Sequence, residues 1–337
     1  MNTETIDCTA LGAWLDGLLP GPAAAVSATK IKGGASNIIY RIERAGKTYA
    51  LRRPPTVKND PTSNNMRREL LLLKALGKSD IPHPRLVAAG EDDSIIGVPF
   101  ALMEWVDGFS PQAPFPEGFS TETAKRALAE ELIDGLATVS NTDWQGIGLQ
   151  GFGKPENFLE RQVDRWLGQL ERARTRELAY LDALCAWLRE HTPAMQRTAL
   201  IHGDYQFINV MFAPALPPRL AAIVDWESAT IVDPLLDLGW VLAGWQDAGE
   251  SGTHATYVDW AGFPPRAEMA ARYAAKTGLD ISNLNFYMAL ALFKLAVIME
   301  GWYARYLSGQ STHPSHKAME TGVPLMLSRA AGFAGLA

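Results

Sequence analysis

The sequence predicts an α+β protein of two lobes, a small antiparallel β-sheet lobe followed by a larger, mainly helical lobe. Strand-like alternation of apolar and polar residues is confined to residues 1–107, whereas helical apolar spacing dominates residues 108–337. Residues 108–119 have the Pro, Gly and Ser content of a connector. With 337 residues, the chain is long for one hydrophobic core and suits two. We therefore expect the lobe boundary near residue 108.

In the first lobe the expected order is β-β-α-β-β after a short amphipathic helix at residues 11–19. Residues 29–53 predict a β-hairpin, with a glycine turn before its first strand. An Asn cap and helical apolar spacing predict a helix at residues 64–79. Residues 82–92 and 97–109 are the two remaining strand candidates.

In the second lobe, a capped helix with early acids is expected at residues 120–140. Residues 154–191 are long, charged and periodic, which indicates two helices. Short strands and loops follow, and from about Leu236 the chain is helical again, apart from a loop at residues 249–265.

The bulk composition excludes several classes of protein. With 47% hydrophobic and 20% charged residues, the chain is typical of a folded, soluble protein. A net charge of -6 argues against nucleic acid as a partner, because phosphate contacts need clustered Lys and Arg. Cys8 and Cys185 are too few for a zinc cluster or a disulfide framework.

The sequence also predicts no membrane attachment and a cytoplasmic location. The first residues lack a basic segment followed by an apolar one, so they do not predict a signal peptide. Residues 286–306 are strongly apolar, but Lys294, Glu300 and Arg305 interrupt them. This spacing favours a mostly buried helix over a membrane span.

Two apolar segments carry polar residues at fixed points. "LIHGDYQFINVMF" contains Asp204 and Asn209, five residues apart, and "IVDWESATIVDPLLDLGW" contains Asp225, Asp233 and Asp237. A buried carboxylate must be paired or bound to a cation. In phosphoryl transfer a carboxylate lies beside the attacking hydroxyl, and an amide oxygen and a second carboxylate hold magnesium. As an alternative, Asp204 caps a turn and Asp225 ends a strand.

A small sheet lobe, a connector and a helical lobe with buried acids is the plan of a kinase. The His-Gly-Asp motif with Asn209, followed by Asp225 and then Asp-Pro-x-x-Asp-Leu, resembles the aminoglycoside phosphotransferase family of kinase-like enzymes. The resemblance covers about residues 30–302 and implies a two-lobed, protein-kinase-like fold. It implies Asp204 as catalytic base and Asn209 and Asp225 as Mg²⁺ ligands. Asp237 would anchor the catalytic loop, and His202 would be a buried packing residue outside the chemistry.

The first lobe is expected to hold the phosphates of the nucleotide. In "KGGASN", the backbone of Gly33, Gly34 and Ala35 can approach phosphate oxygens and Ser36 can donate from its side chain. A plain hairpin entry explains this segment equally well.

Alternation in "YALRR" places Ala50 and Arg52 on one face of a strand. Members of the family usually have Lys where this chain has Arg52, paired to a helix Glu, and Glu69 is the matching acid. Arg keeps the charge, but the two are not interchangeable at a fitted site. "LRRPP" also resembles a subgroup related to the kinase-like domain fused to acyl-CoA dehydrogenases, in which Arg is usual.

The segment "FALMEWVDG" is expected to join the lobes at the nucleotide base. Met103 would lie beside the adenine, with the carbonyl of Glu104 and the N–H of Val106 at the base edge. A buried strand that ends in an Asp-Gly turn explains the composition equally well.

The phosphate acceptor is expected to be a small molecule with a hydroxyl group. The segment between Asp225 and the next helix is too short for a peptide platform. The helical lobe has no dense acidic run that would bind a polycation such as an aminoglycoside. Its arginines predict instead a hydroxy acid or a hydroxyacyl-CoA, although a solvated helix face with ion pairs is an equal alternative: Arg161, Arg165, Arg172 and Arg174.

The predicted function is therefore an ATP- or GTP-dependent, Mg²⁺-dependent phosphotransferase. A kinase-like nucleotide-binding protein without transfer activity is the alternative, and Arg52 motivates it. A metal-dependent hydrolase would need more ligating histidines than His202 supplies.

Overall fold

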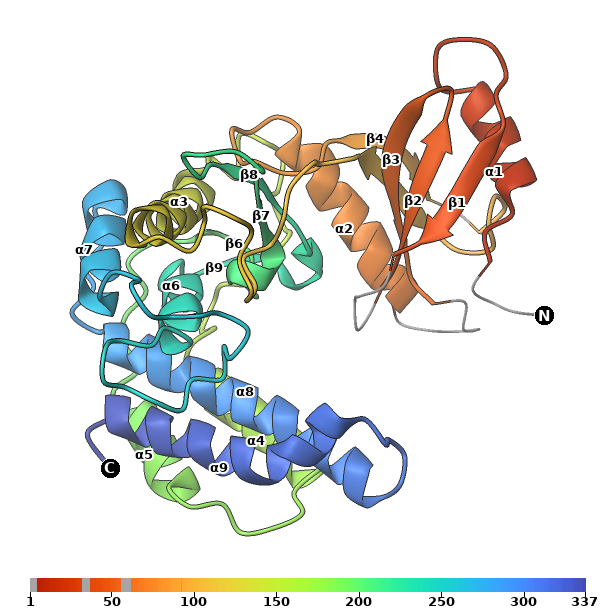
Figure 1. Ribbon diagram of the computed structural model, residues 1–337. Helices are drawn as coiled ribbons and strands as arrows, with labels where there is room; N and C mark the ends of the chain where they lie inside the picture. Colours follow the sequence, from red (N-terminus) through yellow and green to blue (C-terminus); the bar gives the residue numbers. More distant parts are fainter. Residues whose placement is uncertain (1–4, 32–36, 56–61, 92) are drawn as a thin grey trace.

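The computed structural model describes residues 5–31, 37–55, 62–91 and 93–337, and it has two lobes (Figure 1). The first lobe is a five-stranded antiparallel sheet in the order β1-β2-β3-β5-β4, with one helix on each side. Its elements are α1 (Cys8–Asp16), β1 (Val26–Lys30), β2 (Ile38–Arg44), β3 (Lys47–Arg53), α2 (Thr62–Leu76), β4 (Leu86–Gly90) and β5 (Phe100–Glu104).

Period-two alternation gives this sheet two different faces. A tight turn at Ala45 and Gly46, both with positive φ, joins β2 to β3. One face forms a small core with α1, made of Leu11, Leu15, Tyr40, Ile42, Leu51, Phe100 and Leu102. The opposite face carries Ala50 and Met103, which are direct cross-strand partners, and it belongs to the main core of the protein.

The second lobe is mainly helical, with two small antiparallel strand pairs, β6–β9 and β7–β8, near the sheet lobe (Figure 1). Its helices are α3 (Glu122–Asn141), α4 (Gln162–Glu171), α5 (Leu181–Glu190), α6 (Leu235–Ala243), α7 (Arg266–Thr277), α8 (Leu284–Leu307) and α9 (Pro314–Phe333). Its strands are β6 (Ala199–Ile201), β7 (Val210–Phe212), β8 (Leu220–Ile223) and β9 (Thr230–Val232), with short 3₁₀ turns η1 (Phe207–Asn209) and η2 (Trp226–Ser228).

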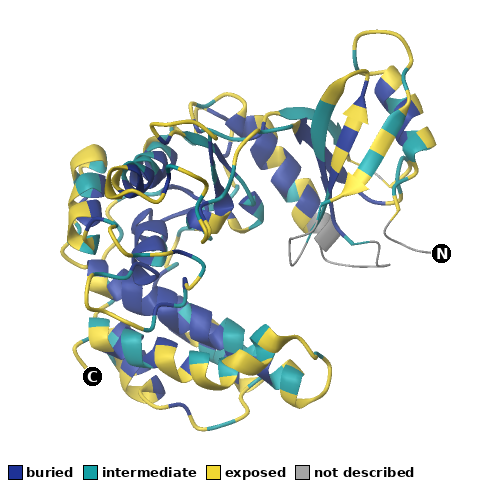
Figure 2. Ribbon diagram, viewed as in Figure 1, coloured by how far each residue is buried: buried dark blue, intermediate teal, exposed yellow. Residues whose placement is uncertain are grey.

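Helix α8 is the centre of the helical lobe and is buried along most of its length (Figure 2). By length and composition it is apolar enough to cross a membrane, but 72% of its most apolar window is buried inside the protein. It packs against α6 so closely that a side chain at Gly239 would overlap Tyr287. The prediction of a mostly buried helix over residues 286–306 is therefore confirmed.

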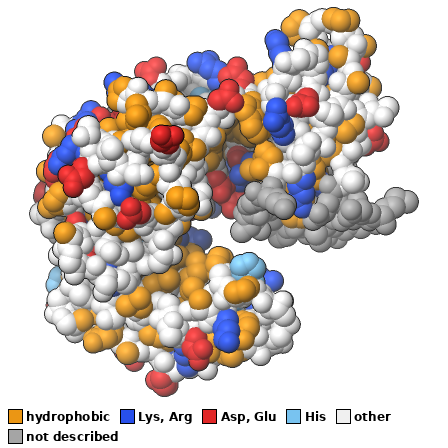
Figure 3. Space-filling view, in the orientation of Figure 1, with side chains coloured by type: hydrophobic (Ala, Val, Ile, Leu, Met, Phe, Trp, Pro, Cys, Tyr) orange, Lys and Arg blue, Asp and Glu red, His pale blue; other side chains and the backbone are white. Residues whose placement is uncertain are grey.

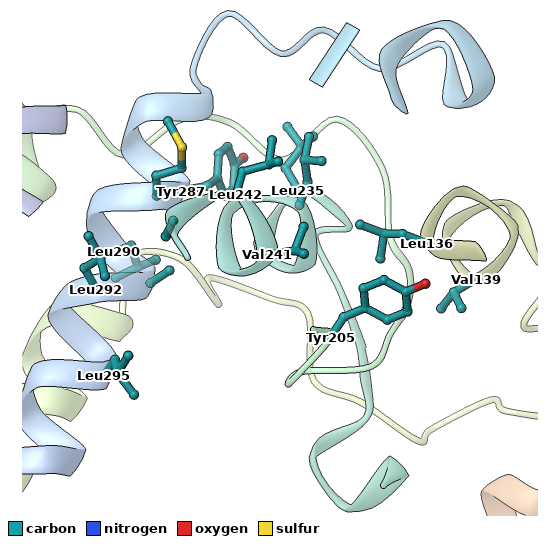
Figure 4. Close-up of a cluster of buried hydrophobic side chains, with 14 of the residues drawn as sticks. Leu136, Val139, Tyr205, Leu235, Val241, Leu242, Tyr287, Leu290, Leu292 and Leu295 are labelled. Atoms are coloured by element: carbon teal, nitrogen blue, oxygen red, sulfur yellow. The ribbon is translucent and has the colours of Figure 1, made fainter. Parts of the chain in front are cut away.

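Tyr205 connects this core to the loop between β6 and β7. Its ring lies near Leu136 and Val139 of α3 (Figure 4), and its hydroxyl donates to the carbonyl of Leu132 at 2.7 Å. The loop at residues 202–209 is therefore fixed to α3 by the buried side chain of Tyr205.

The predicted α+β fold is confirmed, as are the two helices within residues 154–191. The sequence predicted a two-stranded hairpin at residues 29–53, but the structure has a third strand, β1, paired with β2. Four of the five residues of β1 are polar or small, and the strand is an exposed edge, so its apolar pattern is weak. Gly33, Gly34, Ala35 and Ser36 lie outside the described residues.

Candidate active site

The loop that follows β6 is held to α6 by one buried carboxylate. Asp237 accepts hydrogen bonds from the backbone N–H groups of His202 at 2.6 Å and Gly203 at 2.8 Å. Gly203 has φ 82°, and a side chain there would collide with the backbone of Ser228. Burial raises the pKa of Asp237 to about 6, whereas the two N–H groups lower it. Asp237 thus fixes the backbone immediately before Asp204.

His202 joins the two loops that carry the predicted site residues. Its Nε2 lies 2.8 Å from the carbonyl of Val224, and its Nδ1 accepts from the N–H of Asp204 at 3.3 Å. Burial lowers its pKa to about 4, so the ring is neutral, and these partners imply that Nε2 carries the proton. The ring also packs on Trp226 at a centroid distance of 4.7 Å. Both ring nitrogens of His202 thus make contacts that hold the two loops together.

Asp204 and Asn209 lie in direct contact. The amide Nδ2 of Asn209 donates to Oδ2 of Asp204 at 2.8 Å and to its backbone carbonyl at 2.9 Å. The 3₁₀ turn η1 returns the chain after Asp204, which explains why a spacing of five residues brings the two side chains together. Burial raises the pKa of Asp204 to about 6, against the lowering effects of Lys294 and of the amides of Asn209 and Gln206.

Asp225 lies next to this pair, in a backbone conformation that is unusual for a residue with a side chain. The N–H of Val224 donates to the carbonyl of Asn209 at 2.9 Å. Asp225 itself has φ 66° and ψ 57°, in the left-handed region. Strain of this kind persists where surrounding contacts impose it, and it is concentrated at functional sites. It turns the Asp225 carboxylate toward the sheet lobe, where it meets Arg52.

Arg52 of β3 is the centre of a charged cluster between the lobes. Its Nη2 lies 2.6 Å from Oδ1 of Asp225 and 3.2 Å from Oε2 of Glu227, and its Nε lies 3.2 Å from Oε1 of Glu69. Asn37 adds a further contact between the lobes, with its Nδ2 2.8 Å from Oε2 of Glu227. Acidic and basic side chains lie together in the hollow between the lobes (Figure 3).

This cluster explains why a guanidinium suits the position better than an ammonium. The planar guanidinium reaches three carboxylates from two of its nitrogens, Nη2 and Nε, whereas Lys has a single nitrogen, Nζ. Burial disfavours the charge of Arg52, but Glu69, Asp225 and Glu227 together raise its pKa, so it stays charged. Burial raises the pKa of Glu69 to about 7, against the lowering effect of Arg52. One guanidinium faces three carboxylates, which leaves an excess of negative charge.

The donor atoms fit a hard divalent cation. Because Nδ2 of Asn209 is turned to Asp204, its Oδ1 is the atom left to act as a ligand. This oxygen and the Asp225 carboxylate are the type of ligand that Mg²⁺ prefers, with phosphate oxygens and water completing the shell. In the part of the chain that the structure describes, no three His, Cys, Asp or Glu residues form a metal cluster.

Other groups of the helical lobe also surround Asp204 and its loop. Nε2 of Gln206 donates to Oδ1 of Asp204 at 2.7 Å, and the hydroxyl of Tyr257 lies 3.0 Å from Oε1 of Gln206. Lys294 of α8 also approaches the loop, with its Nζ 3.3 Å from the carbonyl of Gly203. Gln206 and Tyr257 thus limit how the Asp204 carboxylate can turn.

The connection between the lobes follows β5. Met103 is buried opposite Ala50, while Glu104 is exposed and Val106 is half-buried. The N–H of Glu104 donates to the carbonyl of Arg85 at 2.9 Å. A backbone pair between Phe109 and Phe212 then joins this segment to β7. The predicted base-contacting residues thus lie on one short segment at the end of the sheet.

The structure joins seven of the predicted site residues through direct contacts, namely Arg52, Glu69, His202, Asp204, Asn209, Asp225 and Asp237, but two of the predicted arginines make their contacts elsewhere. Arg161 contacts the carbonyl of Lys154, and Arg174 pairs with Glu177. Arg165 is exposed on α4, where its guanidinium lies over the Trp166 ring.

Sequence reasoning missed Glu227 and Lys294. An acid two residues after Asp225 was the available signal for Glu227. For Lys294 the signal was a lone charge inside an apolar helix, which we interpreted only as an argument against a membrane span.

Comparison with known proteins agrees with this arrangement. Residues 27–273 match the phosphotransferase enzyme family. A solved structure from Ralstonia eutropha, assigned to the aminoglycoside phosphotransferases, is 30% identical, with a TM-score of 0.84 over 98% of this chain and 99% of that chain. The GDP complex of aminoglycoside 2'-phosphotransferase-IIIa shares the fold at 18% identity, with a TM-score of 0.63 over 97% of this chain and 99% of that one.

Among curated proteins, acyl-CoA dehydrogenase family member 10 of Mus musculus is 32% identical over 95% of this chain and 30% of its own length. Member 11 of Gallus gallus is 32% identical over 91% of this chain and 41% of its own length. The chain thus spans well under half of these relatives.

The two-lobed fold and the family match define a kinase-like phosphotransferase. The chain belongs to the phosphotransferase enzyme family.

Proposed function

We propose that the protein transfers the γ-phosphate of ATP, in the presence of Mg²⁺, to a hydroxyl of a small molecule, with a hydroxy acid or hydroxyacyl-CoA favoured over an aminoglycoside. One observation carries this proposal. Asp204 and Asn209 are in contact, Asp225 lies beside them, and the Arg52–Glu69 pair faces Asp225 from the other lobe. A base, a cation site and a phosphate-binding guanidinium are the parts that phosphoryl transfer requires.

In this mechanism Asp204 orients the acceptor hydroxyl and takes its proton as the oxygen attacks the γ-phosphorus. The bond between that phosphorus and the bridging oxygen breaks, and ADP leaves. Asn209 and Asp225 would hold Mg²⁺, which when bound neutralises charge on the phosphate oxygens. Asp237 and His202 keep the loop in place, so that little reorganisation is needed during the reaction.

The nucleotide would bind between the lobes, with residues 1–107 as the nucleotide-binding lobe and residues 108–337 carrying the catalytic loop and acceptor site. Ala50 and Met103 would contact the base, with Glu104 and Val106 at its edge. Gly33, Gly34, Ala35 and Ser36 are proposed to approach the phosphates, together with Arg52 held by Glu69. GDP and ADP complexes of structurally similar phosphotransferases are compatible with either ATP or GTP.

The acceptor and the location are also proposals. The positive charge of Lys294 near Asp204 and the likeness to acyl-CoA dehydrogenase family members favour an anionic acceptor over a polycation. Helix α8 is a core helix, and we propose that the protein acts in the cytoplasm.

A nucleotide-binding protein without transfer activity is the second candidate. The observation that favours it is that Arg52 already occupies Asp225, the proposed Mg²⁺ ligand. An intact Asp204–Asn209 pair argues against it, because binding alone needs no base.

The two candidates are separated by ADP release. We would incubate the protein with ATP or GTP, with and without Mg²⁺, and with a panel of hydroxylated metabolites. Acceptor-dependent, Mg²⁺-dependent ADP release supports the phosphotransferase. Nucleotide binding with no turnover on any acceptor supports the binding protein instead.

A further inference from the structure

Lys294 is a partly buried lysine at the inner side of the helical lobe, and the mechanism above does not use it. Its Nζ lies 4.4 Å from the ring centre of Trp240 on α6 and 5.9 Å from that of Trp166 on α4. Three helices, α4, α6 and α8, therefore meet at one ammonium group. That group lies beside Gly203, the residue before the proposed base Asp204.

The ammonium group of Lys294 has unused donors. It carries three N–H bonds, and among the described residues its one hydrogen-bond acceptor is the Gly203 carbonyl, at 3.3 Å. Indole faces attract a cation, but they do not replace an oxygen acceptor. An ammonium in this setting is ready to bind an oxygen atom of a ligand.

Lys294 approaches the Asp204 loop from the helical lobe, through the Gly203 carbonyl, and different charges surround it and Arg52. Burial lowers the pKa of Lys294, Asp204 and Asp237 raise it, and Arg165 lowers it. The charges that act on Arg52 are a different set, namely Glu69, Asp225 and Glu227. Asp204 is influenced by members of both sets, since Lys294 lowers its pKa and Asp225 raises it. The proposed base thus lies near both the Arg52 cluster and Lys294.

We propose that Lys294 binds a carboxylate of the acceptor, with Trp166 and Trp240 as apolar walls and Arg165 as a second positive charge at the rim. This inference rests on the proposed function and deepens it. It narrows the acceptor to a hydroxycarboxylate whose free acid group lies a few carbon atoms from the hydroxyl that meets Asp204. A carboxylate accepts the unused N–H bonds of Lys294, whereas a polycation would be repelled by Lys294 and Arg165.

The experiment measures binding and so does not depend on turnover. The probes are straight-chain hydroxycarboxylates with the hydroxyl two to five carbons from the acid, each paired with the diol in which CH₂OH replaces the carboxylate. Binding to the protein with Mg²⁺ and ADP is followed by tryptophan fluorescence, because Trp166 and Trp240 border the site. We expect at least one acid to bind about tenfold or more tightly than its diol, as one charge-assisted hydrogen bond would give.

Lys294→Met keeps the length of the side chain and removes its charge, so the preference for acid over diol should fall to about one. Lys276→Met is the matched control, since Lys276 pairs with Asp134 on α3 and should leave the preference unchanged. If Lys294→Met fails to fold, as judged by loss of ADP binding, Arg165→Met is used. Arg165 is exposed, and its loss should reduce the same preference severalfold.

Two outcomes would overturn the inference: the native protein binds no acid better than its diol, or Lys294→Met keeps the preference. Equal loss of turnover on acids and diols in Lys294→Met, without an acid preference in binding, would assign Lys294 to the transferring phosphoryl group instead. Acid-selective binding without ADP release on any probe would contradict the proposed phosphotransferase activity but support the carboxylate site.

Discussion

The two ends of the site differ in their charge balance and in where their residues originate. At the nucleotide end, Arg52 of the sheet lobe meets Glu69, Asp225 and Glu227, so that acids outnumber the cation. At the other end, Lys294 and the exposed Arg165 lie near two carboxylates, Asp204 and Asp237, so that the charges balance, and all four groups belong to the helical lobe.

Under the proposed function, this difference indicates which ligand each end would bind. The excess of carboxylate between the lobes would be balanced by a divalent cation bound with the nucleotide. The N–H bonds of Lys294 that have no acceptor among the described residues would be taken by an anionic acceptor. The two ligands would thus depend on different residues of one site. The predictions below test this division, from the largest expected effect to the smallest.

Removing the base should abolish turnover and leave the nucleotide end intact. In Asp204→Ala we expect the rate of ADP release to fall by about 10³-fold, within the range for general-base catalysis. Mg²⁺-dependent nucleotide affinity should fall far less than turnover, about tenfold at most, because Arg52 and Asp225 keep their contacts while Asn209 loses one hydrogen bond to Asp204. Asp164→Ala, an exposed acid on α4, is the control. Retained turnover in Asp204→Ala would remove that residue from the mechanism.

Removing Asp225 should weaken nucleotide binding and leave acceptor binding unchanged. Asp225→Ala deletes a proposed Mg²⁺ ligand, so nucleotide affinity measured with Mg²⁺ should fall by about tenfold to a hundredfold, on the scale of 1.4–2.7 kcal/mol. Affinity measured with a chelator should change little. Binding that stays Mg²⁺-dependent in this variant would show that another group holds the cation. The acid-over-diol preference should survive, since it depends on Lys294.

The pH dependence of turnover should follow the ionisation of Asp204. The pKa of Asp204 is raised to about 6, mainly by burial, and the carboxylate acts as a base when it is ionised. Activity should therefore be full above pH 7 and fall about tenfold per pH unit below about pH 6. We would measure kcat/KM with saturating Mg²⁺ and nucleotide. A profile that stays flat down to pH 5 would contradict Asp204 as the base.

The smallest expected effect concerns the orientation of the base. Tyr257→Phe removes the hydroxyl that meets Gln206, which in turn contacts Asp204. One neutral hydrogen bond is worth about 1 kcal/mol, so kcat should fall about fivefold with nucleotide affinity unchanged. Circular dichroism and melting temperature check that the fold is kept. A drop in nucleotide affinity would contradict the prediction, because it would show that Tyr257 also affects nucleotide binding.

The sequence was informative where residues close in the chain act together. The spacing between Asp204 and Asn209, and the anchoring role expected for Asp237, depend on one loop and the helix that follows, and the observed contacts match the motif. Strand alternation also predicted that Ala50 and Arg52 share one face of β3, and the structure shows that this face packs on the main core and meets Asp225.

Contacts between residues far apart in the sequence could not be predicted from local patterns. Lys294 meets Gly203 across 91 residues, and Arg52 meets Glu227 across 175, so no local pattern marks either contact. The edge strand β1 was missed for another reason, because a half-exposed strand does not need apolar alternation.

The support of Asp204 and Asp225 has a consequence for motion between the lobes. Asp237 holds the loop before Asp204, and His202 ties that loop to Val224, so both carboxylates are fastened to the same lobe. If the sheet lobe moves away from the helical lobe, the pairs that Arg52 makes with Asp225 and Glu227 separate, while Asp204 and Asp225 keep their spacing. Under the proposed function, opening the site for a new nucleotide would break these ion pairs and leave the proposed base and cation ligands in place.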